Sequence, residues 1–430
     1  MRKNNVKIAV IGLGYVGLPL TVEFSKYFSV VGFDLDITRI KELRKGHDRT
    51  KELSKRQLQN TVNLTLSSDL NKIKNSNVYI ITVPTPVNKN NIPDLKPLKK
   101  ASSMVGAILN KNDLVIYEST VFPGATENIC VPILERDSDL KYKTDFFCGY
   151  SPERINPGDK KHSLHNTIKI TSGCNKKASD FIDWLYNKIV KAGTHLVESI
   201  EIAEAAKVIE NVQRDVNIAL INELSMIFNK LGIDTLDVLN AASTKWNFLP
   251  FKPGLVGGHC IGVDPYYLTH RAVEVGYHPE MILAGRKIND QMGFYIAEKT
   301  VAELTRQNIN LIDAKIGILG LTFKENCSDI RNTKVIDIIK QLNLYKCKLY
   351  ITDEWVDKAD AKEELDVSLV DLNTIKGCDA IIIAVSHDVY TNFTIDAWKR
   401  MINDDGVVID VKSIYKKEIF KGTAIKYWRL

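Results

Sequence analysis

Short apolar runs rich in β-branched residues alternate with helical patterns over the first part of the chain. Each run ends near a Gly, Pro, Ser, Thr or Asp, as strands commonly do. The predicted strands are Lys7–Ile11, Val30–Asp34, Val78–Val83, Asp113–Glu118 and Phe146–Tyr150. Strands separated by helices favour a parallel sheet with crossover helices. We therefore expect a first α/β domain over residues 1–198.

A long helical pattern follows this domain. From Ser199 to Leu231 the chain contains no Gly and no Pro, and its apolar residues recur with the helical period. Ser199 is a candidate N-cap, and Gly232 can end the helix. A helix of about 30 residues is unusually long for a globular protein, so we expect it to join two domains and to pack against a second subunit. Further helical patterns, interrupted by a loop at Trp246–Pro265, complete a central helical domain of residues 199–312.

The strand–helix alternation returns in the last part of the chain. The predicted strands are Ile316–Leu319, Lys348–Thr352, Ala380–Val385 and Val407–Asp410. They define a third domain over residues 313–430, and the two α/β ends repeat an architecture without repeating a sequence. The expected fold class is α/β, with two Rossmann-like domains joined by a long central helix and a helical middle region.

Composition and charge exclude several classes of protein. The chain has 430 residues, 44% of them hydrophobic and 26% charged, as in an ordinary globular protein. The longest nearly apolar run, Ile8–Leu20, has 13 residues and is too short to span a bilayer. No small-residue cleavage site follows it, so we expect a cytoplasmic protein without a membrane partner. The net charge of +6 is a weak bias that does not predict nucleic-acid binding but suits an anionic small molecule.

The seven cysteines show no metal or disulfide pattern. Their number is odd, and no pair has the C-x-x-C spacing. We therefore expect neither a disulfide framework nor a metal site. Most cysteines should be small buried side chains, and a reactive one must be identified by its surroundings.

The first predicted strand leads directly into Gly-Leu-Gly-Tyr-Val-Gly at residues 12–17. Asp34 ends the next strand, 22 residues after Gly12. This spacing is typical of dinucleotide binding, in which glycines let the backbone approach the pyrophosphate and a carboxylate binds the ribose hydroxyls. A carboxylate would repel a 2′-phosphate, so NAD is favoured over NADP. The alternative is an ordinary tight strand–helix turn.

Polar residues also follow other predicted strands. Val-Pro-Thr-Pro and Glu-Ser-Thr-Val-Phe-Pro-Gly follow the third and fourth strands and bring Thr85, Ser119 and Thr120 to the carboxyl edge of the sheet, beside the cofactor. Ser-Pro-Glu-Arg follows the fifth strand and contains Glu153 and Arg154. Simple strand-end turns and a solvated surface loop remain the alternatives.

Two further groups of residues are candidates for chemistry. Lys207 and Asn211 lie four apart on the long helix and so share one face, although both could be simple exposed positions. Gly-Gly-His-Cys-Ile-Gly-Val-Asp contains Cys260 between His259 and Asp264. A cysteine in a glycine-rich loop is a candidate nucleophile, although a buried, inert cysteine is the commoner case.

Together these motifs resemble the nucleotide-sugar 6-dehydrogenases, the UDP-glucose/UDP-mannuronate dehydrogenase family. The resemblance covers essentially the whole chain, since the motifs arrive in family order and end with Lys324 and Arg331. Residues 155–161 and 245–268 are most similar to enzymes that oxidise UDP-N-acetylhexosamines. Those enzymes are the UDP-GlcNAc and UDP-GalNAc dehydrogenases of bacterial surface-polysaccharide pathways.

The resemblance implies a four-electron oxidation of the sugar C6 alcohol to a carboxylate, with two NAD molecules reduced in turn. Cys260 matches the nucleophile that captures the aldehyde as a thiohemiacetal, which a second hydride transfer converts to a thioester. Lys207 and Asn211 match the residues that stabilise oxyanions at C6. Asp264 matches the carboxylate that handles the alcohol proton together with Lys207 and a water.

The resemblance also assigns thioester hydrolysis and ligand binding. Glu153 matches the glutamate of hydrolysis, and Thr120 is expected to position the catalytic water. The implied cofactor contacts are Gly12, Gly14, Tyr15, Val16, Gly17, Asp34, Arg39, Thr85, Ser119, Thr120 and Arg331. The implied substrate contacts are Glu153, Arg154, Lys207, Asn211, Phe251, Gly254, Gly257, His259 and Lys324. A homodimer or higher homo-oligomer is expected through the long helix.

Several positions depart from the pattern of the UDP-glucose enzymes. Pro157 and Val263 replace the glutamate and lysine usual there, and Arg154 and His259 replace smaller or apolar neighbours. We therefore expect a UDP-N-acetylhexosamine as substrate, with UDP-glucose or UDP-ManNAc as the alternatives. Two other classes remain: a two-electron β-hydroxyacid dehydrogenase, which needs neither Cys260 nor a third domain, and a non-catalytic NAD-binding regulator.

Overall fold

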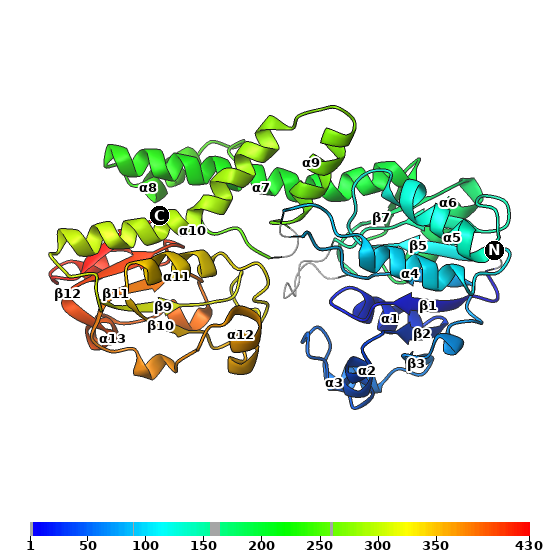
Figure 1. Cartoon of the computed structure of the whole chain (residues 1–430), viewed down its shortest axis with the longest axis horizontal. Coiled ribbons are helices and arrows are strands. Elements are labelled where there is room, and N and C mark those ends of the chain that lie inside the picture. The colour runs from blue at the N-terminus through cyan, green and yellow to red at the C-terminus, as the bar shows by residue number, and fades with distance from the viewer. Residues whose placement is uncertain (1–2, 89, 155–163, 259–260) are drawn as a thin grey trace. The chain divides into compact units, whose positions relative to one another are not determined.

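The computed structural model describes residues 3–88, 90–154, 164–258 and 261–430. They form two compact units, residues 1–210 with 266–278 and residues 211–265 with 279–430. The helices labelled in Figure 1 are α1 Gly17–Ser25, α2 Ile37–Arg44, α3 Lys55–Gln59, α4 Lys96–Gly106, α5 Val131–Ser138, α6 Lys176–Tyr186, α7 Ile200–Leu231, α8 Thr235–Ala242, α9 Asp264–Glu274, α10 Glu280–Arg306, α11 Val335–Leu344, α12 Lys358–Leu365 and α13 Ile395–Met401.

The first unit contains a sheet with the strand order β3-β2-β1-β4-β5-β6-β7-β8. The strands are β1 Lys7–Ile11, β2 Ser29–Phe33, β3 Leu64–Ser67, β4 Val78–Ile81, β5 Leu114–Tyr117, β6 Phe147–Tyr150, β7 Lys169–Gly173 and β8 Thr194–Leu196. The first six are parallel in the order of a dinucleotide-binding fold. The five strands predicted from the sequence are thus parallel as expected, whereas β7, which was not predicted, runs antiparallel to β6, and β8 runs parallel to β7.

The five predicted strands of this unit are confirmed to within two residues at either end. β3, β7 and β8 lack the signal that identified the others. Leu64–Ser67 is only partly buried, and β8 is exposed at two of its three positions, so neither forms an apolar run. The strands of the sheet centre are fully buried because helices cover them, and one face packs on α1 and α6 through Phe24, Phe181 and Leu185.

The second unit contains a sheet of five parallel strands in the order β10-β9-β11-β12-β13. The strands are β9 Lys315–Leu319, β10 Lys348–Thr352, β11 Cys378–Ile383, β12 Ile402–Asp410 and β13 Lys426–Arg429. Alternate residues serve opposite faces. Ile316 and Ile382 pack with α10 and α11, whereas Ile381 and Ile383 pack with Trp398 of α13. The two Rossmann-like domains predicted from the sequence are thus confirmed.

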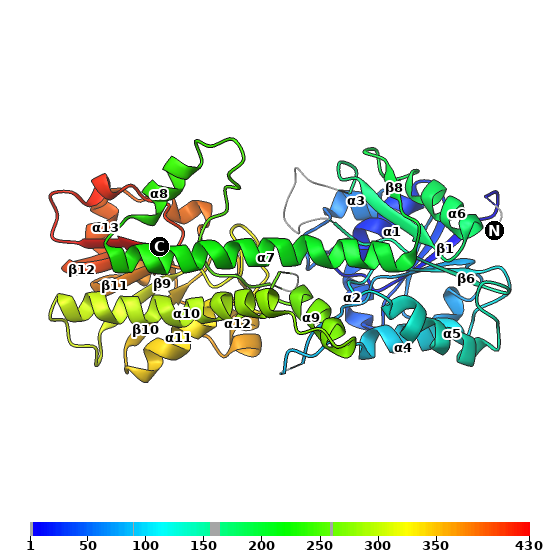
Figure 2. The ribbon, with the colours of Figure 1, turned by 90° about the horizontal axis from the view of Figure 1, so that it is seen from above.

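The long helix is also confirmed, as α7. The Ser199 hydroxyl accepts the backbone N–H of Ile202 at 3.2 Å, and Gly232 ends the helix with φ +71°. Figure 2 shows the C-terminal half of α7 beside α10 within the second unit, where Arg286 of α10 is paired with Asp215 of α7 at 2.6 Å. Among the helices that the structure describes, none combines the length and apolar character that crossing a bilayer requires.

Candidate active site

The turn after β1 contains three glycines. At two of them the backbone tolerates no side chain without strain, and the third borders open space. Gly12 has φ +97°, and a Cβ on Gly17 would lie 1.8 Å from the carbonyl oxygen of Gly12. A Cβ on Gly14, by contrast, would meet no atom within 4 Å, and Gly14 is exposed at the N-terminus of α1, beside Tyr15 and Val16. Open space at the N-terminus of a helix fits a dinucleotide pyrophosphate.

Asp34 lies where a ribose-binding carboxylate is needed. Its Oδ2 accepts the N–H of Leu13 in the glycine turn at 2.8 Å, and Oδ1 accepts the N–H of Asp36 at 2.9 Å. The carboxylate is half-buried and therefore fixed in orientation yet open to a ligand. Arg39 is buried, and its guanidinium donates to Leu13 O at 3.0 Å and to Asp48 at 2.7 Å. Its cofactor contact stays a prediction, while its observed contacts stiffen the turn.

The loops after β4 and β5 are tied to the same edge of the sheet. Ser119 donates to the carbonyl oxygen of Val83 at 2.6 Å, and Thr85 and Thr120 are half-buried. Sequence reasoning missed Thr82, whose hydroxyl lies 2.7 Å from Gly12 O. A threonine directly after a strand gives no signal by itself, because its partner lies 70 residues away.

Glu204 is a second residue that sequence reasoning missed. It is completely buried on α7, and its carboxylate accepts the N–H groups of Gly124 and Thr126 at 2.6 and 2.9 Å. Burial raises its pKa to about 7. Glu204 thereby fixes the loop that begins at Thr120.

The Ser-Pro-Glu-Arg loop after β6 is held from two sides. Arg154 is paired with Glu210 of α7 at 2.7 Å and donates to Ile168 O at 2.8 Å. Glu153 is buried, and its Oε2 lies 3.2 Å from the ammonium group of Lys169. The carboxylate therefore belongs to the protein interior rather than to a solvated loop.

Lys207 and Asn211 lie one turn apart on α7, and both are buried. The Asn211 amide donates to the carboxylate of Asp264, the first residue of α9, at 2.5 Å. Across the described parts of the chain, the ammonium group of Lys207 has no carboxylate or hydrogen-bond partner, although the side chain is only 8% exposed. A buried cation without a counter-ion is costly and favours an anionic ligand or transition state.

The loop that contains Phe251 and Gly254 is clamped by Asn222 of α7. The Asn222 amide accepts the N–H of Gly254 at 2.8 Å and donates to its carbonyl oxygen at 3.1 Å. Asn222 is completely buried, and its second amide hydrogen reaches Asn289 at 2.8 Å. Phe251 is half-buried. Sequence reasoning predicted the loop but missed the asparagine that fixes it.

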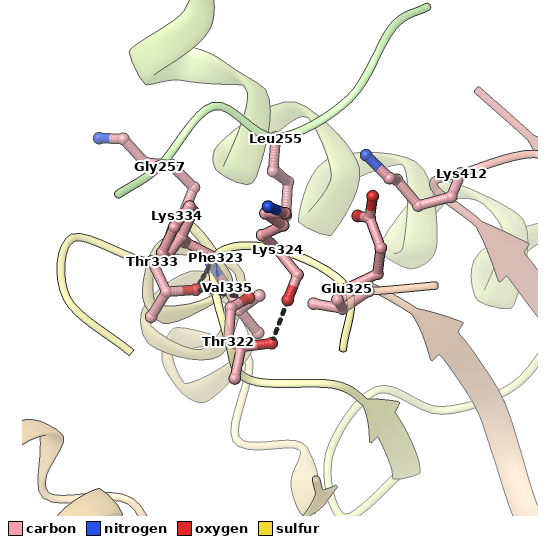
Figure 3. A pocket seen from close by; sticks show the side chains of 12 residues that line it. Leu255, Gly257, Thr322, Phe323, Lys324, Glu325, Thr333, Lys334, Val335 and Lys412 are labelled. Atoms are coloured by element: carbon pink, nitrogen blue, oxygen red, sulfur yellow. Dashed lines mark hydrogen bonds between the residues drawn. The ribbon is translucent and has the colours of Figure 1, made fainter. Parts of the chain in front are cut away.

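A pocket of the second unit gathers further predicted residues (Figure 3). Gly257 and Lys324 line it, and the hydroxyl of Thr322 donates to the Lys324 carbonyl at 2.8 Å. Lys334 and Lys412, which the sequence did not indicate, line the same pocket and add two further cations. Arg331 is exposed and paired with Asp329 at 2.6 Å. Three lysines against the single carboxylate of Glu325 suit a phosphorylated ligand.

The predicted nucleophile Cys260, its neighbour His259 and Pro157 lie outside the described residues. The other six cysteines are free, and burial raises the pKa of each, in Cys130 to about 12. None of these six thiols is therefore activated as a thiolate. Among the described residues, no three His, Cys, Asp or Glu side chains form a cluster that could hold a metal ion.

Comparison with known proteins yields relatives that match almost the whole chain. The UDP-N-acetyl-D-glucosamine 6-dehydrogenase of Salmonella typhi is 53% identical over 415 residues, which are 96% of this chain and 98% of the relative. The enzyme of the same name from Pseudomonas aeruginosa is 51% identical over 414 residues, again 96% and 98% of the two chains. The solved structure of UDP-D-ManNAc dehydrogenase from Pyrococcus horikoshii is 30% identical, with a TM-score of 0.89, and the match covers 98% of this chain and 99% of that one.

Three family models match successive parts of the chain. The NAD binding domain of the UDP-glucose/GDP-mannose dehydrogenase family matches residues 6–190, its central domain residues 201–291, and its UDP binding domain residues 317–417. The predicted family and the predicted cofactor, NAD, are thus confirmed. With the dinucleotide turn and Asp34 in the first unit and the lysine-lined pocket in the second, the chain belongs to the UDP-glucose/GDP-mannose dehydrogenase family.

Proposed function

We propose that this NAD-dependent dehydrogenase oxidises C6 of a UDP-N-acetylhexosamine, UDP-GlcNAc or UDP-GalNAc, to the uronate. The observation that carries the proposal is a set of three buried polar residues. Lys207 lies on α7 one turn before Asn211, and the Asn211 amide is hydrogen-bonded to Asp264, the first residue of α9. The substrate class is supported by relatives at 53% and 51% identity that are named UDP-N-acetyl-D-glucosamine 6-dehydrogenases, against 30% for the UDP-D-ManNAc enzyme.

In the first oxidation, Asp264 accepts the proton of the C6 hydroxyl through a water, and Lys207 stabilises the alkoxide. Asn211 holds the Asp264 carboxylate at 2.5 Å and keeps it oriented. NAD, when bound, supplies the hydride acceptor. The glycine turn and Asp34 fix the pyrophosphate and the ribose, so that the sugar carbon and the nicotinamide meet in one geometry.

The aldehyde requires a nucleophile before it can lose a second hydride. The thiolate of Cys260 adds to it, and Lys207 with Asn211 stabilises the resulting oxyanion as a thiohemiacetal forms. The second hydride transfer gives a thioester. Glu153, with Thr120 positioning a water, then takes a proton from that water as its oxygen attacks C6, and the Cys260 thiolate leaves.

NADH yield and the choice of sugar test this proposal directly. We expect two NADH per sugar, and a kcat/KM for UDP-GlcNAc or UDP-GalNAc above that for UDP-glucose and UDP-ManNAc. One NADH per sugar would favour a two-electron dehydrogenase, and no turnover with any sugar would favour a regulator. Equal or better use of UDP-glucose would overturn the substrate class but not the reaction.

The nucleophile is tested with matched cysteine variants. Cys260→Ala should abolish the four-electron oxidation, and Cys260→Ser should slow it by orders of magnitude and trap an ester visible in the intact mass. Cys327→Ser is the control, because Cys327 is half-buried and its pKa is raised by burial. Two NADH per sugar at the wild-type rate from Cys260→Ser would contradict the covalent mechanism.

We also propose a cytoplasmic homodimer formed through α7. Ile202, Ile209, Leu220 and Ile227 are 46%, 53%, 51% and 45% exposed. At about 100° per residue, these four positions return to the same side of the helix within about 20°. An apolar stripe of this length on one helix suits a second copy of the chain. Ile209→Asp should lower the mass measured by light scattering to that of a monomer, whereas Glu223→Ala on the same helix should not.

A further inference from the structure

Lys169 is a buried cation between two carboxylates in the first unit. Its side chain is 3% exposed, and its ammonium group lies 2.8 Å from Glu118 Oε2 and 3.2 Å from Glu153 Oε2. The same group donates to the carbonyl oxygen of Pro152 at 3.0 Å. One lysine therefore binds both the side chain of Glu153 and the backbone directly before it.

The fold explains why a lysine from a distant part of the sequence lies here. Glu118 follows β5 and Glu153 follows β6, so both lie at the carboxyl edge of the parallel strands. Because β7 runs antiparallel to β6, its first residue, Lys169, lies at that same edge. Were β7 parallel like the six strands before it, Lys169 would lie at the opposite edge.

The rest of the network holds Lys169 in place rather than exposing it to solvent. The Tyr186 hydroxyl of α6 donates to the second oxygen of Glu118, and the Lys169 ammonium group lies 5.2 Å from the centre of the Tyr186 ring. Burial acts to lower the pKa of Lys169, but Glu118 and Glu153 raise it overall, so the lysine is charged. Without that charge, Glu118 and Glu153 would face each other with no cation between them.

The loop around Glu153 is joined to β7 at successive residues. Ser151 donates to Ile170 O at 2.7 Å, and Arg154 donates to Ile168 O at 2.8 Å. Lys169 lies between these two bonds and reaches Glu153 Oε2, while the backbone N–H of Arg154 donates to Oε1 at 2.6 Å. The backbone bonds fix the loop, and Lys169 adds a charged contact to the carboxylate.

We infer that Lys169 is a positioning residue for thioester hydrolysis, which holds the Glu153 carboxylate in one orientation while Glu118 and Tyr186 hold Lys169. This inference rests on the proposed function. In the hydrolytic step, the water oxygen bonds to C6, one water proton passes to Glu153, the C–S bond breaks, and its electron pair returns to the Cys260 sulfur. Lys169 neither gains nor loses a proton and acts only through Glu153.

Lys169→Met tests this role, because methionine fills a similar volume without charge. We expect kcat to fall by roughly 10- to 100-fold, with kcat/KM for UDP-sugar changed less than about threefold, because hydrolysis alone is slowed and KM falls together with kcat. Rapid mixing should still give the fast phase of two NADH per active site, followed by slow turnover. The intact mass during turnover should show the sugar bound to Cys260 as a thioester.

Three further variants separate positioning from stability. Glu153→Gln should accumulate the same thioester. Combining it with Lys169→Met should lower kcat little further than Glu153→Gln alone, since both substitutions act on one step. Lys169→Arg should recover part of kcat, because it restores the charge. Thr171→Val is the matched control. It removes a buried hydrogen bond to Asp183 from the same strand and should leave turnover unchanged.

Three outcomes would contradict these assignments. Wild-type kcat in Lys169→Met, or loss of the fast NADH phase together with turnover, would overturn the inference. Absence of NADH from the wild-type enzyme would instead overturn the proposed function.

Discussion

The turns after the first strands of the two sheets are built alike but are covered differently. Gly12 has φ +97° and donates to Phe33 O at 2.9 Å, and Gly320 has φ +93° and donates to Thr352 O at 2.8 Å. In both sheets an aspartate directly after the second strand accepts the N–H of the residue after the glycine. Asp34 Oδ2 accepts from Leu13 at 2.8 Å, and Asp353 Oδ2 accepts from Leu321 at 2.6 Å.

The difference lies in what surrounds each aspartate. Asp34 is half-buried, and the hydrogen bonds it accepts from described residues come from the backbone N–H groups of Leu13 and Asp36, so a ribose can reach it. Asp353 is buried, and the completely buried ring of His387 lies 3.0 Å from its Oδ2. His387 Nδ1 accepts the N–H of Asn326 at 2.9 Å, so its Nε2 carries the hydrogen that faces Asp353.

The chain after the turn differs as well. The first turn enters α1 at Gly17, whereas the second continues as a loop until α11 begins at Val335. That loop contains Lys324, and its conformation is fixed by Thr322 and His387. The same backbone conformation therefore forms an accessible dinucleotide-binding turn in one unit. In the other unit it forms a buried turn that fixes the loop containing Lys324.

The largest expected effect on stability comes from replacing the buried Asp353. Asp353→Ala leaves His387 and the N–H groups of Leu321 and Thr322 without their acceptor. Each buried donor left unsatisfied costs about 1–3 kcal/mol of unfolding free energy. With three such donors, we expect a loss of roughly 3 kcal/mol or more in urea unfolding followed by the fluorescence of Trp355 and Trp398. Asp34→Ala should cost far less, and equal losses from the two variants would contradict the comparison.

The same aspartate predicts a pH dependence. Burial acts to raise the pKa of Asp353, but the hydrogen bonds that its carboxylate accepts, that of His387 first, lower it below the usual 3.8. An acid with a lowered pKa stabilises the fold above its unfolded pKa and loses that contribution as the pH falls further. The difference in stability between wild type and Asp353→Asn should therefore shrink below about pH 4. A constant difference down to pH 2 would contradict this assignment.

Gly17→Ala should give the next largest effect. The added Cβ would lie 1.8 Å from Gly12 O and 2.4 Å from the Thr82 hydroxyl. Overpacking of about 1–3 kcal/mol would move the turn and weaken NAD binding by up to roughly 100-fold in calorimetry. The matching position five residues after Gly320 is the exposed Glu325, and Glu325→Ala should leave NAD binding unchanged. NAD binding within threefold of wild type in Gly17→Ala would show that the turn is not rigid.

Asp34→Asn tests whether the accessible aspartate sets the preference for NAD over NADP. Asparagine keeps an oxygen for the Leu13 N–H but removes the charge that repels a 2′-phosphate. We expect the ratio of kcat/KM for NAD over NADP to fall by roughly tenfold, or about 1.4 kcal/mol. Asp353→Asn should leave that ratio unchanged, because its carboxylate is sealed. A wild-type enzyme that prefers NADP would contradict the role of Asp34.

The smallest expected effect is that of Thr82→Val. Its hydroxyl lies 2.7 Å from Gly12 O, and the corresponding residue beside Gly320 is Ala384, which has no hydroxyl. Losing one such bond costs about 1 kcal/mol, so NAD should bind about fivefold more weakly while the KM for UDP-sugar stays the same. A change confined to the KM for UDP-sugar would contradict the assignment of Thr82 to the NAD turn.

The sequence by itself determined the elements whose signal is local. Buried parallel strands are continuous apolar runs, so Lys7–Ile11 was predicted with its observed bounds. The bounds of the edge strand Lys348–Thr352 were also predicted as observed, although it is only partly buried. A helix without Gly or Pro between a serine cap and a glycine identified α7. The glycine spacing with Asp34 identified the dinucleotide turn, because each of those residues is demanded by the backbone next to it.

Only the tertiary structure decided which polar side chains meet. Lys169 reaches Glu118 across 51 residues and Glu153 across 16, and it does so because β7 turns antiparallel. Glu204, Asn222 and Lys412 likewise contact loops distant in sequence, so no local spacing indicates them. Tertiary burial also decides which of the two corresponding aspartates can bind a ligand. Asp34 stays accessible, whereas Asp353 is covered by His387, 34 residues further along the chain.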